Sequence, residues 1–275
     1  MEQPNVLPAP SVASRFLPFL AAGVAALVFV SWLLNTPEGL LGKADAVGYA
    51  ICHRIDLRSF HLGERQLPLC ARCTGIYLGV VGGMLTLGVL GRGRAGGLPR
   101  GGVLFMLLGF TGLMGVDGIN SYLTFFPRLP HLYEPHNWLR LTTGTLNGLT
   151  VAAFIAPVFN QTVWREWDER LAVSWRELGA LALVGAAIIG LVLTENPIIL
   201  YPLALLSALG VVILLTALFT TLLLIATRRT NRAVNWGGAF LPLTLGFTLA
   251  VLQIGLVDAL RYFVFQSWEG LIFPG

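Results

Sequence analysis

The stretch NPIILYPLALLSALGVVILLTALFTTLLLIAT, residues 196–227, contains no Asp, Glu, Lys or Arg. A charged side chain at the centre of a bilayer costs about 2.5 to 3.5 kcal/mol even on a lenient insertion scale. About 20 apolar residues in a helix cross about 30 Å of hydrocarbon, so this stretch predicts a membrane-spanning helix. The whole chain agrees, because 55% of its 275 residues are hydrophobic and 12% are charged, whereas a soluble domain carries about 25% charged residues.

Six further stretches are comparably apolar and predict six more spans, although one of them contains Asp117 and Asn120 near its end. These stretches are residues 16–37, 73–91, 101–126, 141–164, 178–194 and 233–257. Two amphipathic segments, near residues 36–51 and 160–178, predict short helices that lie in the membrane interface. We therefore expect an all-α fold, a polytopic transmembrane bundle of about seven spans with short interfacial helices.

The organisation along the chain is predicted from composition. Residues 1–14 are polar and rich in Pro and Ser, which is typical of a disordered tail. Residues 15–160 are expected to form a membrane core that carries the Cys/His motif, and residues 161–275 to add further helices to the same bundle. The bilayer is the predicted partner, and we expect no nucleic-acid partner.

Basic residues predict the orientation of the bundle. If the spans alternate, ten basic residues fall on the face that holds the N-terminus and eight on the other, and five of those eight lie in a single connection. The positive-inside rule then places the N-terminus in the cytoplasm and residues 52–73 outside the cell membrane.

That connection ends in CHRIDLRSFHLGERQLPLCARCTGIY, residues 52–77, which holds every cysteine of the chain. A C-x-x-C pair directs two sulfurs to one metal ion, and Cys52 supplies a third thiolate beside Cys70 and Cys73. Candidates for a fourth ligand are the four histidines of the chain, His53, His61, His131 and His136. We predict a Cys3His-type zinc site of Cys52, Cys70, Cys73 and His53.

The same thiols allow other interpretations. A C-x-x-C at a helix N-terminus beside Arg72 favours the thiolate, and therefore thiol–disulfide exchange by Cys70 and Cys73. A permanent disulfide with one spare thiol, or three merely buried cysteines, is the simpler structural explanation. The odd number of cysteines mildly favours a metal.

A second polar group lies on neighbouring spans. Asp117 and Asn120 share one helical face, and Asn137 and Arg140 begin the next span. We predict that Asp117 and Arg140 form an ion pair, since either charge alone near hydrocarbon is costly. The residues Asp117, Asn137 and Arg140 are candidate catalytic groups, although the pair alone also serves as a structural link between two helices. Arginines at this face suit an anionic small molecule or lipid headgroup, because guanidinium binds phosphate through paired hydrogen bonds.

The elements CHRIDLRSF, PLCARCTGIYLG, DGIN and NWLRLTTGTLNG together resemble the prokaryotic integral-membrane family named domain of unknown function 2085. The resemblance spans about residues 50–150. It implies that one shared site is formed by Cys52, His53, Arg54, Arg58, Cys70, Arg72, Cys73, Asp117, Asn137 and Arg140. It implies no particular activity.

We therefore predict a metal site packed over a polar pocket, more structural than hydrolytic because three thiolates and an imidazole saturate tetrahedral zinc. An open position on the ion would instead suit hydrolysis of a lipid-linked or small anionic substrate. The alternatives are a membrane thiol–disulfide oxidoreductase that uses Cys70 and Cys73, and a transporter or accessory subunit of a membrane complex. Whether the chain turns over a substrate is left open by its sequence.

Overall fold

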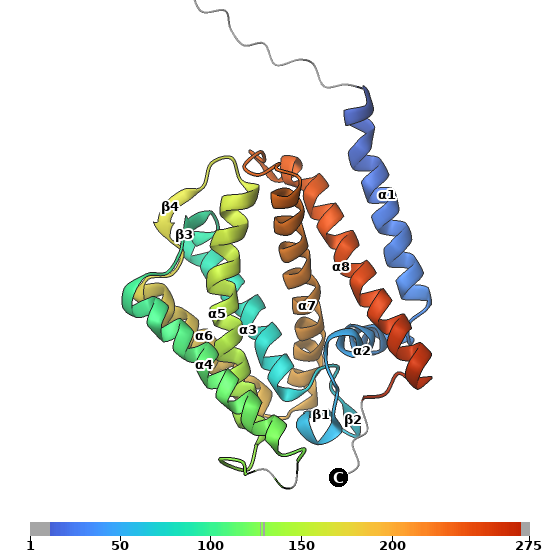
Figure 1. Ribbon diagram of the computed structural model, residues 1–275, viewed down its shortest axis with the longest axis vertical. Helices are drawn as coiled ribbons and strands as arrows, with labels where there is room; N and C mark the ends of the chain where they lie inside the picture. Colours follow the sequence, from blue (N-terminus) through green and yellow to red (C-terminus); the bar gives the residue numbers. More distant parts are fainter. Residues whose placement is uncertain (1–11, 127, 129, 271–275) are drawn as a thin grey trace, which may run out of the picture.

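A computed structural model describes residues 12–126, 128 and 130–270, and this part of the chain is mostly helical (Figure 1). Within it, seven helices are long and apolar enough to cross a membrane. They are α1 (Val12–Leu34), α3 (Ala71–Leu87, continued by a wide helical turn over Gly88–Arg92), α4 (Gly101–Leu123), α5 (Asn137–Val163), α6 (Trp175–Leu193), α7 (Pro197–Ala226) and α8 (Trp236–Phe265). The predicted fold class is confirmed. Residues 1–11 of the predicted disordered tail lie outside the described residues, and α1 begins at Val12.

The connections divide between the two ends of the bundle (Figure 1). One end, which we call the cysteine face, carries α2 (Gly39–Ile51), the short turn Asp56–Arg58 and the hairpin of β1 (His61–Leu62) and β2 (Arg65–Gln66). The loop between α4 and α5 lies at the same end. The opposite face carries β3 (Ala95–Gly97) and β4 (Asp168–Leu171), which pair in parallel. The cysteine motif therefore shares a face with the polar ends of α4 and α5.

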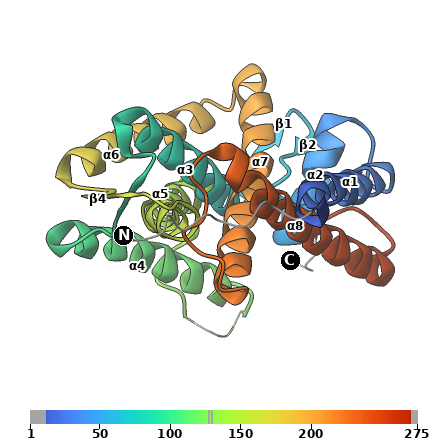
Figure 2. The same ribbon diagram turned by 90° about the horizontal axis from the view of Figure 1, so that it is seen from above.

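Helix α5 lies at the centre of one half of the bundle, where Figure 2 shows it end-on beside α3, α4 and α6. Its closest neighbour is α3. A Cβ atom built on Gly79 of α3 would lie 2.6 Å from Thr145 O, and one built on Gly148 of α5 would lie 3.0 Å from Gly79 Cα. Small residues allow backbones of membrane helices to approach this closely. The glycines thus set the distance between the helix that carries Cys73 and the helix that carries Arg140.

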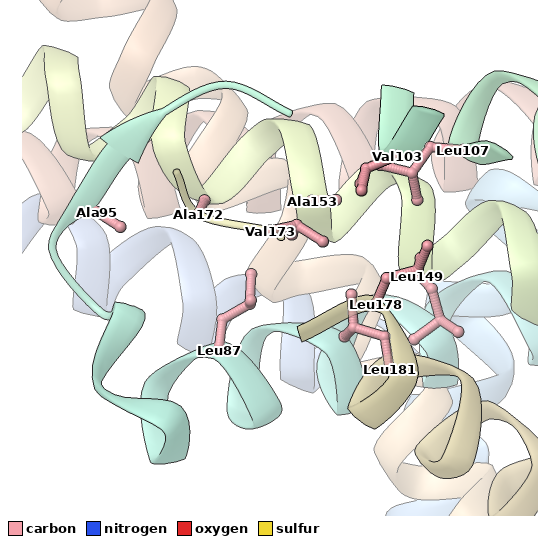
Figure 3. Close-up of a cluster of buried hydrophobic side chains, with 10 residues drawn as sticks. All are labelled: Leu87, Ala95, Val103, Leu107, Leu149, Ala153, Ala172, Val173, Leu178 and Leu181. Carbon is pink, nitrogen blue, oxygen red and sulfur yellow. The ribbon is translucent and has the colours of Figure 1, made fainter. Parts of the chain in front are cut away.

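A hydrophobic cluster closes the opposite end of this half (Figure 3). Leu87 of α3, Leu107 of α4 and Leu149 of α5 are each no more than 1% exposed, and Leu181 of α6 joins them. Leu181 and Leu149 lie together in Figure 3, with Ala172 and Val173 from the segment after β4 completing the cluster. This packing fixes α3, α4, α5 and α6 relative to one another.

One sequence prediction is wrong here. Residues 160–178 do not form an interfacial helix, because they comprise the end of α5, strand β4 and the start of α6. The backbone N–H groups of this segment find partners elsewhere in the chain: Asp168 donates to Arg94 O (2.8 Å) and Ala172 to Gly97 O (2.8 Å). The segment of residues 94–97 accepts these hydrogen bonds, so the backbone of residues 168–172 is satisfied without forming a helix. The helical spacing of the tryptophans gives no sign of this pairing, because it joins segments far apart in sequence.

Candidate metal centre and arginine cluster

The three cysteines come together where α2 ends and α3 begins. Cys52 directly follows α2 and its N–H donates to Gly48 O (2.8 Å), while Cys70 directly precedes α3. Cys73 lies in the first turn of α3. The three Sγ atoms all lie within 4.8 Å of one another. The structure therefore brings together the three thiols that their spacing assigned to one site, and all three are free cysteines.

Apolar side chains surround the sulfurs, and two backbone N–H groups donate hydrogen bonds to one of them. Cys52 is 2% exposed and packs in a cluster with Val47, Leu69 and Val211. Its Sγ accepts hydrogen bonds from the N–H groups of Arg54 and Cys70, each at 3.4 Å. Arg54 has a φ of 51°, in the left-handed region that few non-glycine residues adopt. Together these features form a sulfur cluster in which Cys52 is buried and bound by two N–H donors, while Cys70 and Cys73 are partly exposed.

The thiols share protons unequally. Hydrogen bonds from the Cys52 and Cys73 thiols hold the pKa of Cys70 well below its usual range, against the effect of burial. The hydrogen bond to Cys70, reinforced by burial, raises the pKa of Cys52 to about 12. Cys70 is therefore the cysteine best able to carry negative charge in the absence of a metal.

The histidines do not join this group. Among the residues that the structure describes, the cluster of candidate ligand atoms contains the three sulfurs and no imidazole. His53 is exposed, and the extended backbone at Cys52 (φ −121°, ψ 151°) directs successive side chains to opposite sides. His61 contacts Asp56 (2.8 Å) and His131 contacts Glu134 (2.9 Å). The structure thus places the predicted fourth ligand, His53, away from the sulfurs.

Asp117 forms the centre of the polar cluster on α4. Its carboxylate is 1% exposed and forms an ion pair with Arg72 of α3. The Tyr133 hydroxyl donates to Asp117 Oδ1 (3.0 Å) and the Thr143 hydroxyl to Oδ2 (3.4 Å). The predicted pairing of Asp117 with Arg140 is therefore wrong. Arg140 lies one helical turn before Thr143, closer to the cysteine face, whereas Arg72 on the adjacent helix is level with the carboxylate.

The two asparagines hold the connections in place. Asn120 accepts from Leu132 N (2.6 Å) and donates to Tyr133 O (2.8 Å), which fixes the loop that delivers the Tyr133 hydroxyl to Asp117. Asn137 donates to Ser59 O (3.2 Å) and accepts from Arg140 Nη1 (2.9 Å). Asn137 thereby links the start of α5 to the cysteine segment.

Three guanidinium groups converge beside Asp117, and we refer to Arg58, Arg72 and Arg140 as the arginine cluster. Arg58 donates to Ser121 O (2.9 Å) and its guanidinium lies 3.8 Å from the Phe125 ring centre. Burial, followed by the positive charges of Arg140 and Arg72, lowers the pKa of Arg58 to about 10. The Nε atoms of Arg72 and Arg140 are buried and have no hydrogen-bond partner among the described residues. The cluster therefore holds three positive charges around one carboxylate, with donors to spare.

Two other arginines of the motif belong elsewhere. Arg54, which is 7% exposed, binds Asp45 of α2 at 2.9 Å, and Arg65 binds the other oxygen of the same carboxylate at 2.6 Å. Arg54 also donates to Trp268 O (3.1 Å) in the C-terminal segment. Both guanidinium groups bind Asp45, so these arginines tie the motif to α2 and are not part of the arginine cluster.

Known proteins are similar to this chain, and one protein family matches the segment that contains the site. A family model described as "Predicted membrane protein (DUF2085)" matches residues 52–154. The protein named "Uncharacterized protein MJ1492" of Methanocaldococcus jannaschii is 33% identical over 122 residues, which cover 44% of this chain and 72% of the relative. The chain belongs to the DUF2085 family. An "Uncharacterized protein" of Methanothermobacter thermautotrophicus is 34% identical over 84 residues, 29% of this chain and 76% of the relative. No solved structure matches the chain.

The segment that defines DUF2085 contains the whole candidate site, from Cys52 to Thr143. Sequence reasoning did not find Tyr133, or Ser121, whose hydroxyl accepts from Arg72 at 3.1 Å. A signal for Ser121 existed, since it lies four residues after Asp117 on the same helical face. Tyr133 lies in a loop with no periodic pattern, so only the fold shows that its hydroxyl reaches Asp117.

Proposed function

We propose that this DUF2085 protein holds a zinc-type ion with Cys52, Cys70 and Cys73, and that this ion fixes an adjacent arginine cluster as a binding site for an anion. The observation that supports this most directly is the position of Arg72. It lies between Cys70 and Cys73 in the chain, and its side chain forms the ion pair with Asp117. Any ligand that clamps the two cysteines therefore also fixes Arg72.

The donor set suits such an ion. Thiolates are soft ligands that favour Zn²⁺ or Cu⁺. Sulfurs bound to one zinc ion at about 2.3 Å lie about 3.8 Å apart, and the three Sγ atoms already lie within 4.8 Å of one another. Small side-chain rotations would bring them to bonding positions. His53 as the fourth ligand stays a prediction, since its side chain would have to move from the exposed surface.

The role proposed for the ion is structural. It would link the end of α2 to the start of α3 and compensate the thiolate charges. Apolar side chains such as Val47, Leu69 and Val211 enclose the sulfurs, which favours a closed site over one that admits water and substrate.

Charge balance supports the anion site. Zn²⁺ with three thiolates carries one negative charge, and the Asp117 carboxylate adds a second. The three guanidinium groups of the arginine cluster exceed these by one positive charge. Charges next to hydrocarbon require compensation, and the unpartnered Nε donors of Arg72 and Arg140 are suited to a phosphate or carboxylate, from a lipid headgroup or a small molecule.

Metal analysis tests the first part of the proposal. We expect about one zinc-type ion per chain, by elemental analysis of protein purified under reducing conditions. Cys73→Ser should lose it, and His61→Ala should retain it, because His61 contacts Asp56 outside the sulfur cluster. Wild-type protein without bound metal would refute the metal site.

Ligand binding tests the second part, with inorganic phosphate and phosphatidylglycerol as separate probes. Arg140→Met should weaken binding of the preferred anion about tenfold while leaving the Arg72–Asp117 pair in place. Arg229→Met, an exposed arginine near the end of α7 on the opposite face, is the matched control. Equal binding by both variants would refute the anion site, and the probe that binds distinguishes a free anion from a lipid.

A thiol–disulfide oxidoreductase is the second candidate, favoured by the lowered pKa of Cys70 at the start of α3. Cys70 and Cys73 would lose two protons and two electrons to a quinone or partner disulfide as their S–S bond forms. Alkylation followed by mass analysis separates the candidates. A redox pair becomes blocked on oxidation, whereas metal-bound thiols become reactive only after chelation.

The proposed orientation places the cysteine face outside the cell and the N-terminus in the cytoplasm of a prokaryote. The bias of basic residues towards the opposite face supports it. Glu64→Cys on the exposed hairpin turn and Arg229→Cys provide sites for a membrane-impermeant thiol reagent. We expect labelling at position 64 and none at position 229 in intact cells, and the reverse result would overturn the orientation.

A further inference from the structure

A groove lies between α1 and α8, and Figures 1 and 2 show these two helices far from α4 and α6. Its volume is about 1180 Å³. Leu27 and Val28 of α1 and Val251 and Leu252 of α8 form an apolar wall, which lies on membrane-spanning parts of both helices. Ser31, Asn35 and Gln266 form a polar end near the cysteine face. A groove with an apolar wall and a polar end suits an acyl chain that carries a polar head.

A buried carboxylate lines this groove. Asp258 of α8 is 3% exposed, and its Oδ2 accepts a hydrogen bond from the indole N–H of Trp32 in α1 (3.0 Å). Its Oδ1 is buried without a hydrogen-bond partner among the described residues. A carboxylate oxygen that lacks a donor inside a membrane-spanning helix is costly and commonly marks a ligand or ion path.

Arg261, the nearest cation, does not form an ion pair with Asp258. Arg261 lies one turn along α8, but its guanidinium donates to Tyr49 O and to Cys52 O (2.8 Å) and lies 4.0 Å from the Tyr49 ring centre. It is therefore held by the end of α2. Asp258 Oδ1 is therefore left without a donor among the described residues.

The residues that line the groove around Asp258 indicate which kind of cation would bind there. Trp32, Tyr262 and Trp268 place aromatic rings on the groove, and aromatic rings attract ammonium groups. A calcium or magnesium ion would need about six oxygen ligands, and among the described residues that line the groove Asp258 is the one carboxylate. A primary ammonium group has three N–H donors, which a carboxylate oxygen and the faces of aromatic rings can accept.

We propose that the α1–α8 groove binds a membrane lipid with a primary ammonium headgroup, whose N–H donates to Asp258 Oδ1. The acyl chain lies along the apolar wall, and the headgroup lies beyond it towards the polar end. This site is separate from the arginine cluster and does not depend on it.

The experiment compares two lipids that differ only at the nitrogen. Full-length protein, delipidated in detergent, is titrated with phosphatidylethanolamine and with N-acetyl phosphatidylethanolamine, and binding is followed by native mass spectrometry. Both lipids offer a phosphate to the arginine cluster, but N-acetylation removes the positive charge, so that cluster would favour the N-acetyl lipid. A preference for phosphatidylethanolamine therefore requires an ammonium site. We expect phosphatidylethanolamine to bind about tenfold more tightly.

Variants locate that preference. Asp258→Asn keeps an acceptor for Trp32 and should abolish the preference, whereas Arg140→Met and Glu269→Gln, an exposed carboxylate of the C-terminal segment, should retain it. Gly255→Leu would fill the groove, since a Cβ there lies 3.4 Å from Trp32 Cδ1, and provides a second test if Asp258→Asn does not fold. Equal binding of the two lipids to wild type, or a preference that survives either groove variant, would overturn the proposal.

Discussion

Removal of the Arg72 guanidinium tests the polar cluster most directly. In Arg72→Met the apolar part of the side chain remains, but among the described residues Asp117, 1% exposed, keeps the hydroxyls of Tyr133 and Thr143 as its side-chain partners. Loss of one partner from a buried pair costs about 3 to 5 kcal/mol. Because two hydroxyl donors remain, we expect a loss of about 3 kcal/mol in the free energy of unfolding, at the lower end of that range.

The reciprocal change should cost less. In Asp117→Asn the amide oxygen still accepts from Arg72, whose side chain is 22% exposed and therefore reaches water. We expect a loss of about 1 kcal/mol. The double variant leaves no buried unpaired charge and should be more stable than Arg72→Met, with a coupling energy of about 2 kcal/mol.

The assay is SDS titration of the purified protein in mixed micelles, with metal content measured alongside to separate the ion pair from the sulfur cluster. Arg65→Met is the matched control, because Arg65 is 49% exposed in its pair with Asp45, and such a pair contributes less than about 1 kcal/mol. If Arg72→Met is no more destabilising than Asp117→Asn, or if the two changes are additive, the assignment of Arg72 as the partner of Asp117 is wrong.

Three further predictions concern packing and connections. Gly79→Ala should destabilise by about 1 to 3 kcal/mol because its Cβ meets the backbone of α5, whereas Gly118→Ala, with open space around it, should not, as measured by the same titration. Asn120→Ala should free the loop before α5, seen as faster amide hydrogen exchange of residues 131–133, and unchanged exchange would contradict its role. Asp45→Asn should destabilise by about 1 to 3 kcal/mol by weakening the pairing of buried Arg54; unchanged thermal stability would argue against it.

Apolar stretches, six of them free of charge, predicted the seven long helices but not their ends. Some charged residues at those ends lie inside the helices and have polar partners there. Helix α5 begins at Asn137 rather than residue 141, since Arg140 donates to Asn137. Helix α6 begins at Trp175, since Glu177 binds Arg92 at 2.9 Å and accepts from Ser174 N. A paired charge avoids the cost that an isolated charge meets in hydrocarbon, and the pairing is invisible along the chain.

The sequence likewise predicted some parts of the candidate site and not others. The spacing of Cys52, Cys70 and Cys73 predicted that three sulfurs would meet, and they do. It also suggested His53 as their neighbour, which the extended backbone after α2 directs elsewhere. The cost of a lone charge predicted that Asp117 would form an ion pair. The predicted partner was Arg140, on the next span in sequence, whereas the observed partner is Arg72 of α3.

The sequence alone determined that this chain crosses a membrane several times and that its cysteines and its Asp117 cluster lie at the same end of the spans. Both follow from the free energy of transferring each side chain to hydrocarbon, a quantity that depends on the residue and its neighbours along the chain. Only the tertiary structure decided that Arg72 binds Asp117, that β3 pairs with β4, and that Asp258 lines a groove. Those results depend on how closely α3 approaches α5 and how α1 lies on α8, and such packing joins residues that are far apart in sequence.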